Sequence, residues 1–207
     1  EIPLRLVGSE MCIRDSPRSE LYEKHRDWVL RYPNRDEAYF RNQLVLDLAN
    51  PEVQDFVFGV VDRLMTENPG IAYFKWDCNS PIINAHSAYL AEKQSHLWID
   101  YVRGLYSVLE RIGAKYPDLP MMLCSGGGGR TDYGALRYFT EFWPSDNTDP
   151  LERIFIQWGY SHFFPLKSMC AHVTNWNRST SIKFRTDVAM MCKLGFDIIV
   201  KDLPDDE

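Results

Sequence analysis

The sequence predicts an α/β protein built on a parallel sheet or barrel. Short apolar runs alternate with longer segments whose apolar residues recur at helical spacing, and this alternation is typical of parallel strands connected by helices. One run, MMLC at 121–124, is apolar at every position, as expected of a parallel strand covered on both faces. With 207 residues, 45% of them hydrophobic, the chain can form one domain with a large core.

The first sixteen residues, EIPLRLVGSEMCIRDS, differ in character from the rest of the chain. They show no clear period, and the stretch LVGSEMCIRDS resembles a translated sequencing adapter. We therefore expect residues 1–16 to be a non-native segment and the native chain to begin near Ser16 or Pro17.

The next elements are a short polar helix at 17–28 and an apolar run at 43–48, QLVLDL, typical of a buried strand. Asn50 followed by Pro51 predicts the start of a helix, because Asn caps the first turn and Pro suits the first helical position. Apolar residues recur on one face of this helix, so it should cover a sheet. Another strand is predicted at 71–77.

A long helical pattern runs from about 87 to 114, and a short helix near 133–138 leads to a strand at 139–143. Asp149 and Pro150 then predict the start of another helix. Two further strands, at 168–173 and 195–200, flank a last helix. The inner face of the long helix is expected to hold Leu97, Trp98, Tyr101, Val102, Leu105, Leu109 and Ile112, and that of the helix after Asp149 to hold Leu151, Ile154, Phe155 and Trp158.

Composition excludes several kinds of partner. A net charge of −6 is unfavourable for a nucleic-acid or anionic-membrane surface, and no apolar run reaches the roughly 18 residues of a membrane span. The five cysteines form no CxxC pair and have no histidine at zinc-ligand spacing, so no metal site is predicted. Their odd number and wide spacing favour free thiols and, weakly, a reducing cytoplasmic compartment.

The stretch FKWDCN at 74–79 carries the first candidate catalytic group. Side chains alternate along a strand, so Lys75 and Asp77 should share one face, with Phe74 and Trp76 on the other. A nearby cation favours the ionised carboxylate, which keeps Asp77 available as a nucleophile or electrostatic stabiliser. A surface Lys/Asp pair at a strand end is an equally good interpretation of these residues alone.

Asp146 is the second candidate, three residues beyond the strand predicted at 139–143. In a parallel barrel, side chains at the carboxyl ends of different strands face one pocket, so Asp77 and Asp146 can meet although 69 residues separate them. Two carboxylates across a cleft are what glycosidic hydrolysis requires. The alternative is that Asp146 is only an acid near a helix start.

The glycine run SGGGGR at 125–130 is not a phosphate-binding motif. It lacks the GK[ST] ending of a P-loop, and Thr131 stands where a dinucleotide-binding motif needs its third glycine. Glycines directly after a buried strand instead let the backbone approach a ligand closely, which suits a bound sugar.

FKWDCN together with CSGGGGRTDYGALRYFTEFWPSDNTDPLERIFIQWG resembles the catalytic core of glycoside hydrolase family 36, the α-galactosidases or melibiases. The resemblance extends from about Pro17 to the end of the chain. It implies that residues 17–207 are the C-terminal part of a glycosidase catalytic domain, a partial (β/α)8 TIM barrel with roughly its last five strands and their helices.

The resemblance also implies roles for particular residues. Asp77 corresponds to the family's nucleophile, and Asp146, rather than Asp149, to its acid/base. The implied reaction is a retaining double displacement that releases terminal α-linked galactose, needs no cofactor or metal, and places the two carboxyls roughly 5 to 5.5 Å apart. The implied substrate-binding residues are Arg41, Lys75, Asn79, Cys124, Ser125, Gly126 and Trp143.

The chain departs from the family pattern in its missing parts. A strand with two adjacent Asp residues, a strand with a Trp before an acidic-Pro stretch, and both β-domains are absent, so the chain resembles a fragment that we expect to be unstable and inactive alone. The expected partner is an α-galactoside oligosaccharide, and the full-length protein is expected to be a homo-oligomer. Galactosyl transfer, as in raffinose-synthase relatives, and α-N-acetylgalactosaminidase activity are the alternatives.

Overall fold

The structure is a computed structural model that describes residues 19–40, 43–175, 179–199 and 201. The chain forms two compact units: the first contains the described residues up to Phe74 together with Asn79–Leu119, and the second contains Lys75–Cys78 and the chain from Pro120 onward. Each unit has its own hydrophobic core. Within the described ranges, no helix is both long enough and apolar enough to span a membrane.

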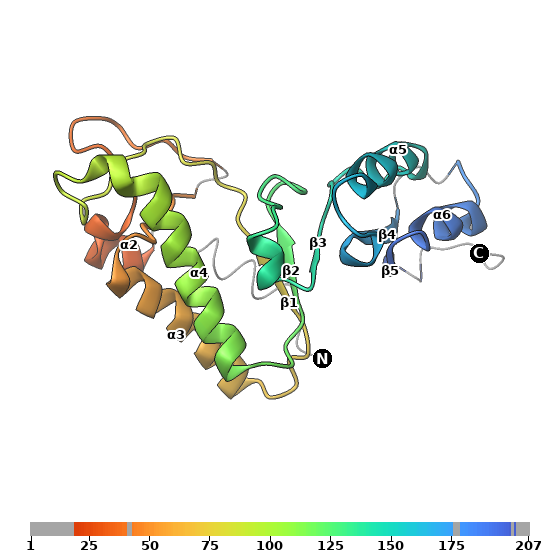
Figure 1. The fold of residues 1–207 in the computed structure, drawn as a ribbon, viewed down its shortest axis with the longest axis horizontal. Helices are drawn as coiled ribbons and strands as arrows, with labels where there is room; N and C mark the ends of the chain where they lie inside the picture. The colour runs from red at the N-terminus through yellow and green to blue at the C-terminus, as the bar shows by residue number, and fades with distance from the viewer. Residues whose placement is uncertain (1–18, 41–42, 176–178, 200, 202–207) are drawn as a thin grey trace. The chain divides into compact units, whose positions relative to one another are not determined.

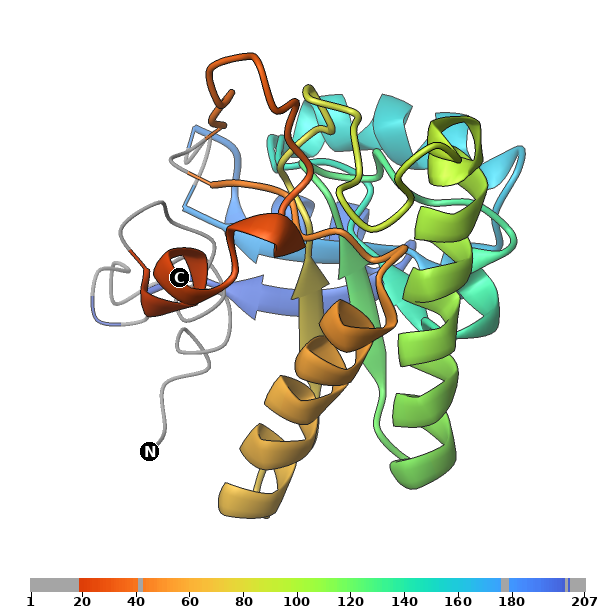
Figure 2. The same ribbon diagram turned by 90° about the vertical axis from the view of Figure 1, so that its left-hand side faces the viewer.

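Two long helices dominate the first unit, α3 (Pro51–Glu67) and α4 (Leu97–Lys115), which Figures 1 and 2 both show side by side. The predicted start of α3 is confirmed, because the Asn50 side chain accepts a hydrogen bond from the Glu52 N–H at 2.9 Å. At Gly104 of α4 an added Cβ would lie only 1.8 Å from the Leu48 carbonyl oxygen, so this helix passes directly against the segment before α3.

The predicted strand at 43–48 is wrong for the residues that the structure describes there. The segment makes isolated antiparallel bridges, one of which joins Val29 and Leu46. The Asp47 N–H belongs to this bridge and donates to the Trp28 carbonyl at 2.7 Å, while its buried carboxylate accepts hydrogen bonds from the Ser87 hydroxyl and the Ala49 N–H. The predicted polar helix at 17–28 is shorter in the structure, where α2 (Glu20–Lys24) precedes the 3-10 turn η1 (Arg26–Trp28).

The second correction concerns the start of α4, which lies ten residues later than predicted and follows the turn η2 (Gln94–His96). The Gln94 side chain accepts a hydrogen bond from the Ser87 N–H at 3.0 Å and donates one to the Ser87 carbonyl at 2.7 Å. These bonds and a left-handed Ala91 (φ 47°) hold the preceding residues in a turn. Trp98 and Val102 are exposed, against prediction, whereas the buried apolar residues of α4 are Leu97, Val108, Leu109 and Ile112.

The second unit contains the strands. A first sheet has the order β1-β2-β3, with β2 and β3 parallel, and a second sheet pairs β4 and β5 in parallel. A parallel bridge between Phe142 and Met169 links the two sheets. The strands are β1 (Phe74–Asp77), β2 (Met121–Cys124), β3 (Glu141–Phe142), β4 (Cys170–Thr174) and β5 (Lys193–Asp197).

In the sequence, η2 and the long helix α4 lie between β1 and β2, and shorter helical elements follow β2; Figure 1 shows the two longest of these beside β4 and β5. The predicted start of the helix after Asp149 is confirmed, because the Asp149 carboxylate accepts hydrogen bonds from the N–H groups of Leu151 and Glu152 at 2.9 and 3.3 Å. The helical elements are η3 (Ala135–Arg137), α5 (Pro150–Ser161), η4 (Leu166–Ser168) and α6 (Ile182–Ala189).

The orientation of α5 contradicts the prediction. Leu151, Phe155 and Trp158 are 50%, 70% and 63% exposed, whereas Arg153 and Gln157 are buried. The reason is that the inner side of α5 faces backbone carbonyl groups, to which Arg153 and Gln157 donate hydrogen bonds. A buried carbonyl without a donor is costly, so polar side chains occupy the inner face.

Candidate active site

Strand β1 presents Lys75 and Asp77 on one side. Both are exposed while Phe74 is buried, as the alternation predicts. The Lys75 ammonium lies over the indole of Trp143, with Nζ 5.7 Å from the ring centroid. The end of β1 therefore directs a cation towards the residue that follows β3.

Trp143 connects this cation to the second candidate carboxylate. Its backbone N–H donates to the Leu123 carbonyl at 2.8 Å, which holds the residue beside the end of β2. The indole is buried, and its Nε1–H donates to Asp146 Oδ1 at 2.9 Å, while Asp146 itself is exposed. The ring thus lies between Lys75 and Asp146.

The Cys124 thiol is buried at the end of β2. Burial at the end of β2 raises its pKa to about 12, with Lys75 acting to lower this pKa and both Asp77 and Asp146 acting to raise it. Burial is the largest of these effects on the thiol, because removal from water disfavours the charged thiolate. The contacts themselves link the candidates: Lys75, on the same side of β1 as Asp77, lies over the indole that donates to Asp146.

The glycine loop after β2 packs mainly against the protein itself. The Gly128 N–H donates to the Pro144 carbonyl at 3.0 Å, and at Gly127 (φ 88°) an added Cβ would lie 2.9 Å from Ser145 Cα. These two glycines allow the loop to approach the backbone that leads to Asp146. At Gly126 (φ 55°), in contrast, an added Cβ would meet open space, so this position leaves room for a ligand.

Ser125 holds the loop to the end of β1. Its hydroxyl donates to the Cys78 carbonyl at 2.7 Å and accepts a hydrogen bond from Arg130 Nε at 3.1 Å. Of the remaining predicted residues, Arg41 lies outside the described residues, and the half-buried Asn79 belongs to the first compact unit. In the part of the chain that the structure describes, no three His, Cys, Asp or Glu side chains gather in a way that could hold a metal ion.

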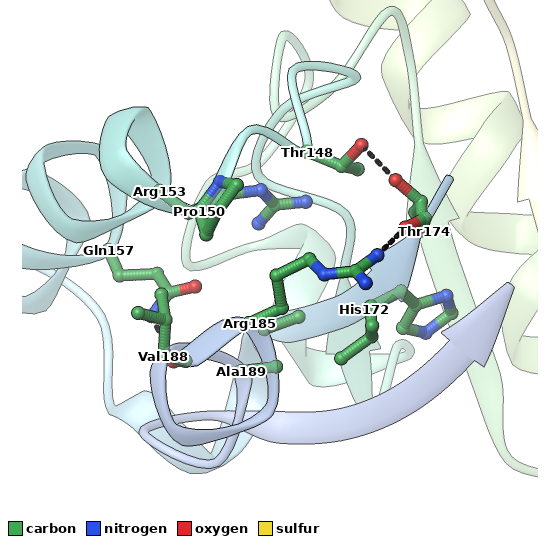
Figure 3. Close-up of a pocket in the computed structure, with 11 residues that line it drawn as sticks. Thr148, Pro150, Arg153, Gln157, His172, Thr174, Arg185, Val188 and Ala189 are labelled. Atoms are coloured by element: carbon green, nitrogen blue, oxygen red, sulfur yellow. Dashed lines mark hydrogen bonds between the residues drawn. The ribbon is translucent and has the colours of Figure 1, made fainter. Parts of the chain in front are cut away.

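A small cavity adjoins the site between β4, α5 and α6 (Figure 3). His172 lies at its edge and contacts Trp143 edge-on, with ring centroids 4.8 Å apart, and burial lowers the pKa of His172. The Arg153 and Arg185 side chains extend into the cavity from α5 and α6. Its lining is different from the predicted site: Thr148, Pro150, Arg153, Gln157, Ala171, His172, Val173, Thr174, Arg185, Val188 and Ala189.

Sequence reasoning missed Arg153, which contacts both Trp143 and the loop that carries Asp146. One signal was present in the sequence. Arg153 and Gln157 are four residues apart on a helix whose other face is strongly apolar, so they form a polar pair on one face.

The family model described as Melibiase matches residues 8–207. The chain belongs to the melibiase family. Among its relatives are α-galactosidase AgaA of Geobacillus stearothermophilus, 39% identical over 93% of this chain and 27% of the relative, and α-galactosidase 2 of Hypocrea jecorina, 40% identical over 93% of this chain and 26% of the relative. This melibiase chain therefore spans about a quarter of the length of these relatives.

Solved structures agree with the family assignment. The α-galactosidase of Lactobacillus brevis matches with a TM-score of 0.88 at 34% identity, covering 92% of this chain and 26% of that structure. An AgaA variant from G. stearothermophilus in complex with stachyose matches with a TM-score of 0.87 at 38% identity, covering 92% and 27%. The resemblance to glycoside hydrolase family 36 inferred from the two motifs is thus confirmed, as is an α/β fold with parallel strands.

Proposed function

We propose that this chain carries both catalytic carboxylates of a retaining glycoside hydrolase that releases terminal α-linked galactose from oligosaccharides. The observation that carries the proposal is that Lys75, on the same side of β1 as Asp77, lies over the Trp143 indole, which donates a hydrogen bond to Asp146. Membership of the melibiase family supports the substrate class. Structures of the relative AgaA with stachyose, raffinose and 1-deoxygalactonojirimycin support it further.

In the proposed reaction the Asp77 carboxylate attacks the anomeric carbon of the galactoside. The glycosidic C–O bond breaks while the protonated Asp146 gives its proton to the departing oxygen. A water molecule then attacks the galactosyl ester and loses a proton to Asp146, which frees Asp77 and releases galactose with its configuration retained. The Trp143 Nε1–H donates to Asp146 Oδ1 and so fixes the direction in which this carboxyl points, while Lys75 lies on the same side of β1 as Asp77.

The same proposal includes the architecture. We assign β1 to β5 as roughly the last five strands of a (β/α)8 barrel, because the two parallel pairings and the Phe142–Met169 bridge form a continuous series. In a barrel the carboxyl ends of all these strands surround one pocket. The remaining substrate contacts would then come from the rest of the barrel, so the 207-residue chain alone should be inactive.

The proposal is tested with the full reading frame that contains this chain. The purified protein is assayed on p-nitrophenyl α-galactoside and raffinose beside the variants Asp77→Ala and Asp146→Ala. We expect Asp77→Ala to lose at least roughly 10³-fold in kcat, since the nucleophile is gone. Asp149→Asn is the matched control, because Asn caps a helix as well as Asp and the change removes only the neighbouring acid.

Three results would contradict the proposal: full activity in either alanine variant, a loss in Asp149→Asn as large as that in Asp146→Ala, or a first-formed β-galactose by NMR. Products formed at high raffinose concentration separate hydrolysis from galactosyl transfer. The p-nitrophenyl glycoside of N-acetylgalactosamine tests the other alternative.

A further inference from the structure

Arg153 of α5 is a charged side chain in an unusual position. It is only 2% exposed, and burial lowers its pKa to about 10. A buried guanidinium is retained at a cost in desolvation unless several acceptors surround it. The acceptors of its hydrogen bonds therefore indicate which part of the protein Arg153 stabilises.

The guanidinium binds the backbone on both sides of Asp146. Nη2 donates to the Ser145 carbonyl at 2.9 Å, and Nε donates to the Asn147 carbonyl at 2.8 Å. Nη1 donates to the Cys170 carbonyl at 3.2 Å, which ties this loop to the start of β4. The residue before Asp146 and the residue after it are thus held by one rigid, planar group.

Arg153 is also linked to Asp146 through the side chain of Trp143. Arg153 Cζ lies 4.6 Å from the centroid of the Trp143 ring, within the range of a cation–π contact. The same indole donates its Nε1–H to Asp146 Oδ1 at 2.9 Å. Arg153 therefore acts on Asp146 through the loop backbone and through the indole.

We propose that Arg153 is a positioning residue for Asp146, which it holds in place for proton transfer to the departing sugar oxygen. This inference rests on the proposed function, in which Asp146 is the acid/base. An acid helps only when its proton points at the oxygen that leaves, so a small displacement of the carboxyl lowers the rate without removing the acid.

The leaving group of the substrate gives the test. A nitrophenolate leaves readily without a proton, whereas the sugar alkoxide of raffinose does not. In the full reading frame, Arg153→Lys and Arg153→Met are expected to lower kcat on raffinose by roughly 10- to 100-fold, since a well-placed general acid contributes about 10² to 10⁴. The rate of nitrophenolate release in the first turnover should fall far less, and KM should change little.

Gln157→Leu is the matched control. Gln157 is buried on the same face of α5 one turn later, but its side chain donates to the Val188 carbonyl of α6 at 3.0 Å. We expect this variant to alter both substrates equally. Arg153→Lys keeps the charge but lacks the planar fork, so it provides the answer if Arg153→Met fails to fold.

An equal loss on both substrates in the Arg153 variants would overturn the inference and leave Arg153 a purely structural residue. Asp146→Ala separates this from failure of the proposed function. If Asp146→Ala loses much more rate on raffinose than on the nitrophenyl galactoside, but the Arg153 variants lose the same on both, only the role of Arg153 is wrong. If Asp146→Ala loses the same rate on both substrates, the assignment of Asp146 as the acid/base is wrong.

Discussion

Helices α4 and α5 both carry a clear apolar stripe, yet they use it in opposite ways. In α4 the residues that point inward, such as Leu109 and Ile112, are apolar and fully buried. In α5 the stripe with Phe155 points outward, and Arg153 and Gln157 are buried. The difference teaches that helical spacing identifies an apolar face, whereas the groups opposite the helix decide which face is buried.

Arg153→Met, on the buried polar face of α5, should have the largest effect on the free energy of unfolding. A rule based on hydrophobicity alone predicts that an apolar residue at a buried position stabilises the protein. We expect the reverse, a loss of roughly 3 to 5 kcal/mol in the free energy of unfolding, because three carbonyls lose a charged donor. Denaturant unfolding of the full reading frame measures this, and an unchanged or raised stability would refute our explanation of α5.

Ile112→Ala tests the buried apolar face of α4. Ile112 is fully buried on the inner face of α4. The truncation removes apolar contacts and leaves a cavity, so we expect a loss of about 2 to 4 kcal/mol in the same unfolding experiment. Val102→Ala on the exposed side of α4 is the control, and an equal loss in the two variants would mean that the assigned inner face is wrong.

Phe155→Gln, on the exposed apolar face of α5, gives the smallest expected effect and tests whether that face is uncovered. Because this ring is 70% exposed, its replacement should change the free energy of unfolding by no more than about 0.5 kcal/mol. A loss of several kcal/mol in the full-length protein would show that this face of α5 is covered there, and the contrast with α4 would then hold only for the chain described.

Local chemistry made several features predictable. Asn50 and Asp149 cap their helices in the structure because capping depends on a few adjacent residues. The alternation of buried and exposed side chains in β1 and the uniformly buried β2 were likewise predictable from adjacent residues. The 43–48 segment was not, because its apolar run resembles a strand, whereas in the structure it makes only isolated bridges and the Asp47 carboxylate is bound by Ser87, 40 residues away.

The sequence by itself determined the family, the alternation of strands and helices, and the two motifs that contain Asp77 and Asp146, because each is encoded by neighbouring residues. Only the tertiary structure decided that Lys75 and Asp146 share one indole and that Arg153 holds the loop around that acid. These contacts join the ends of separate strands to a helix. No pattern along the chain records which carbonyls will be buried there and need a donor.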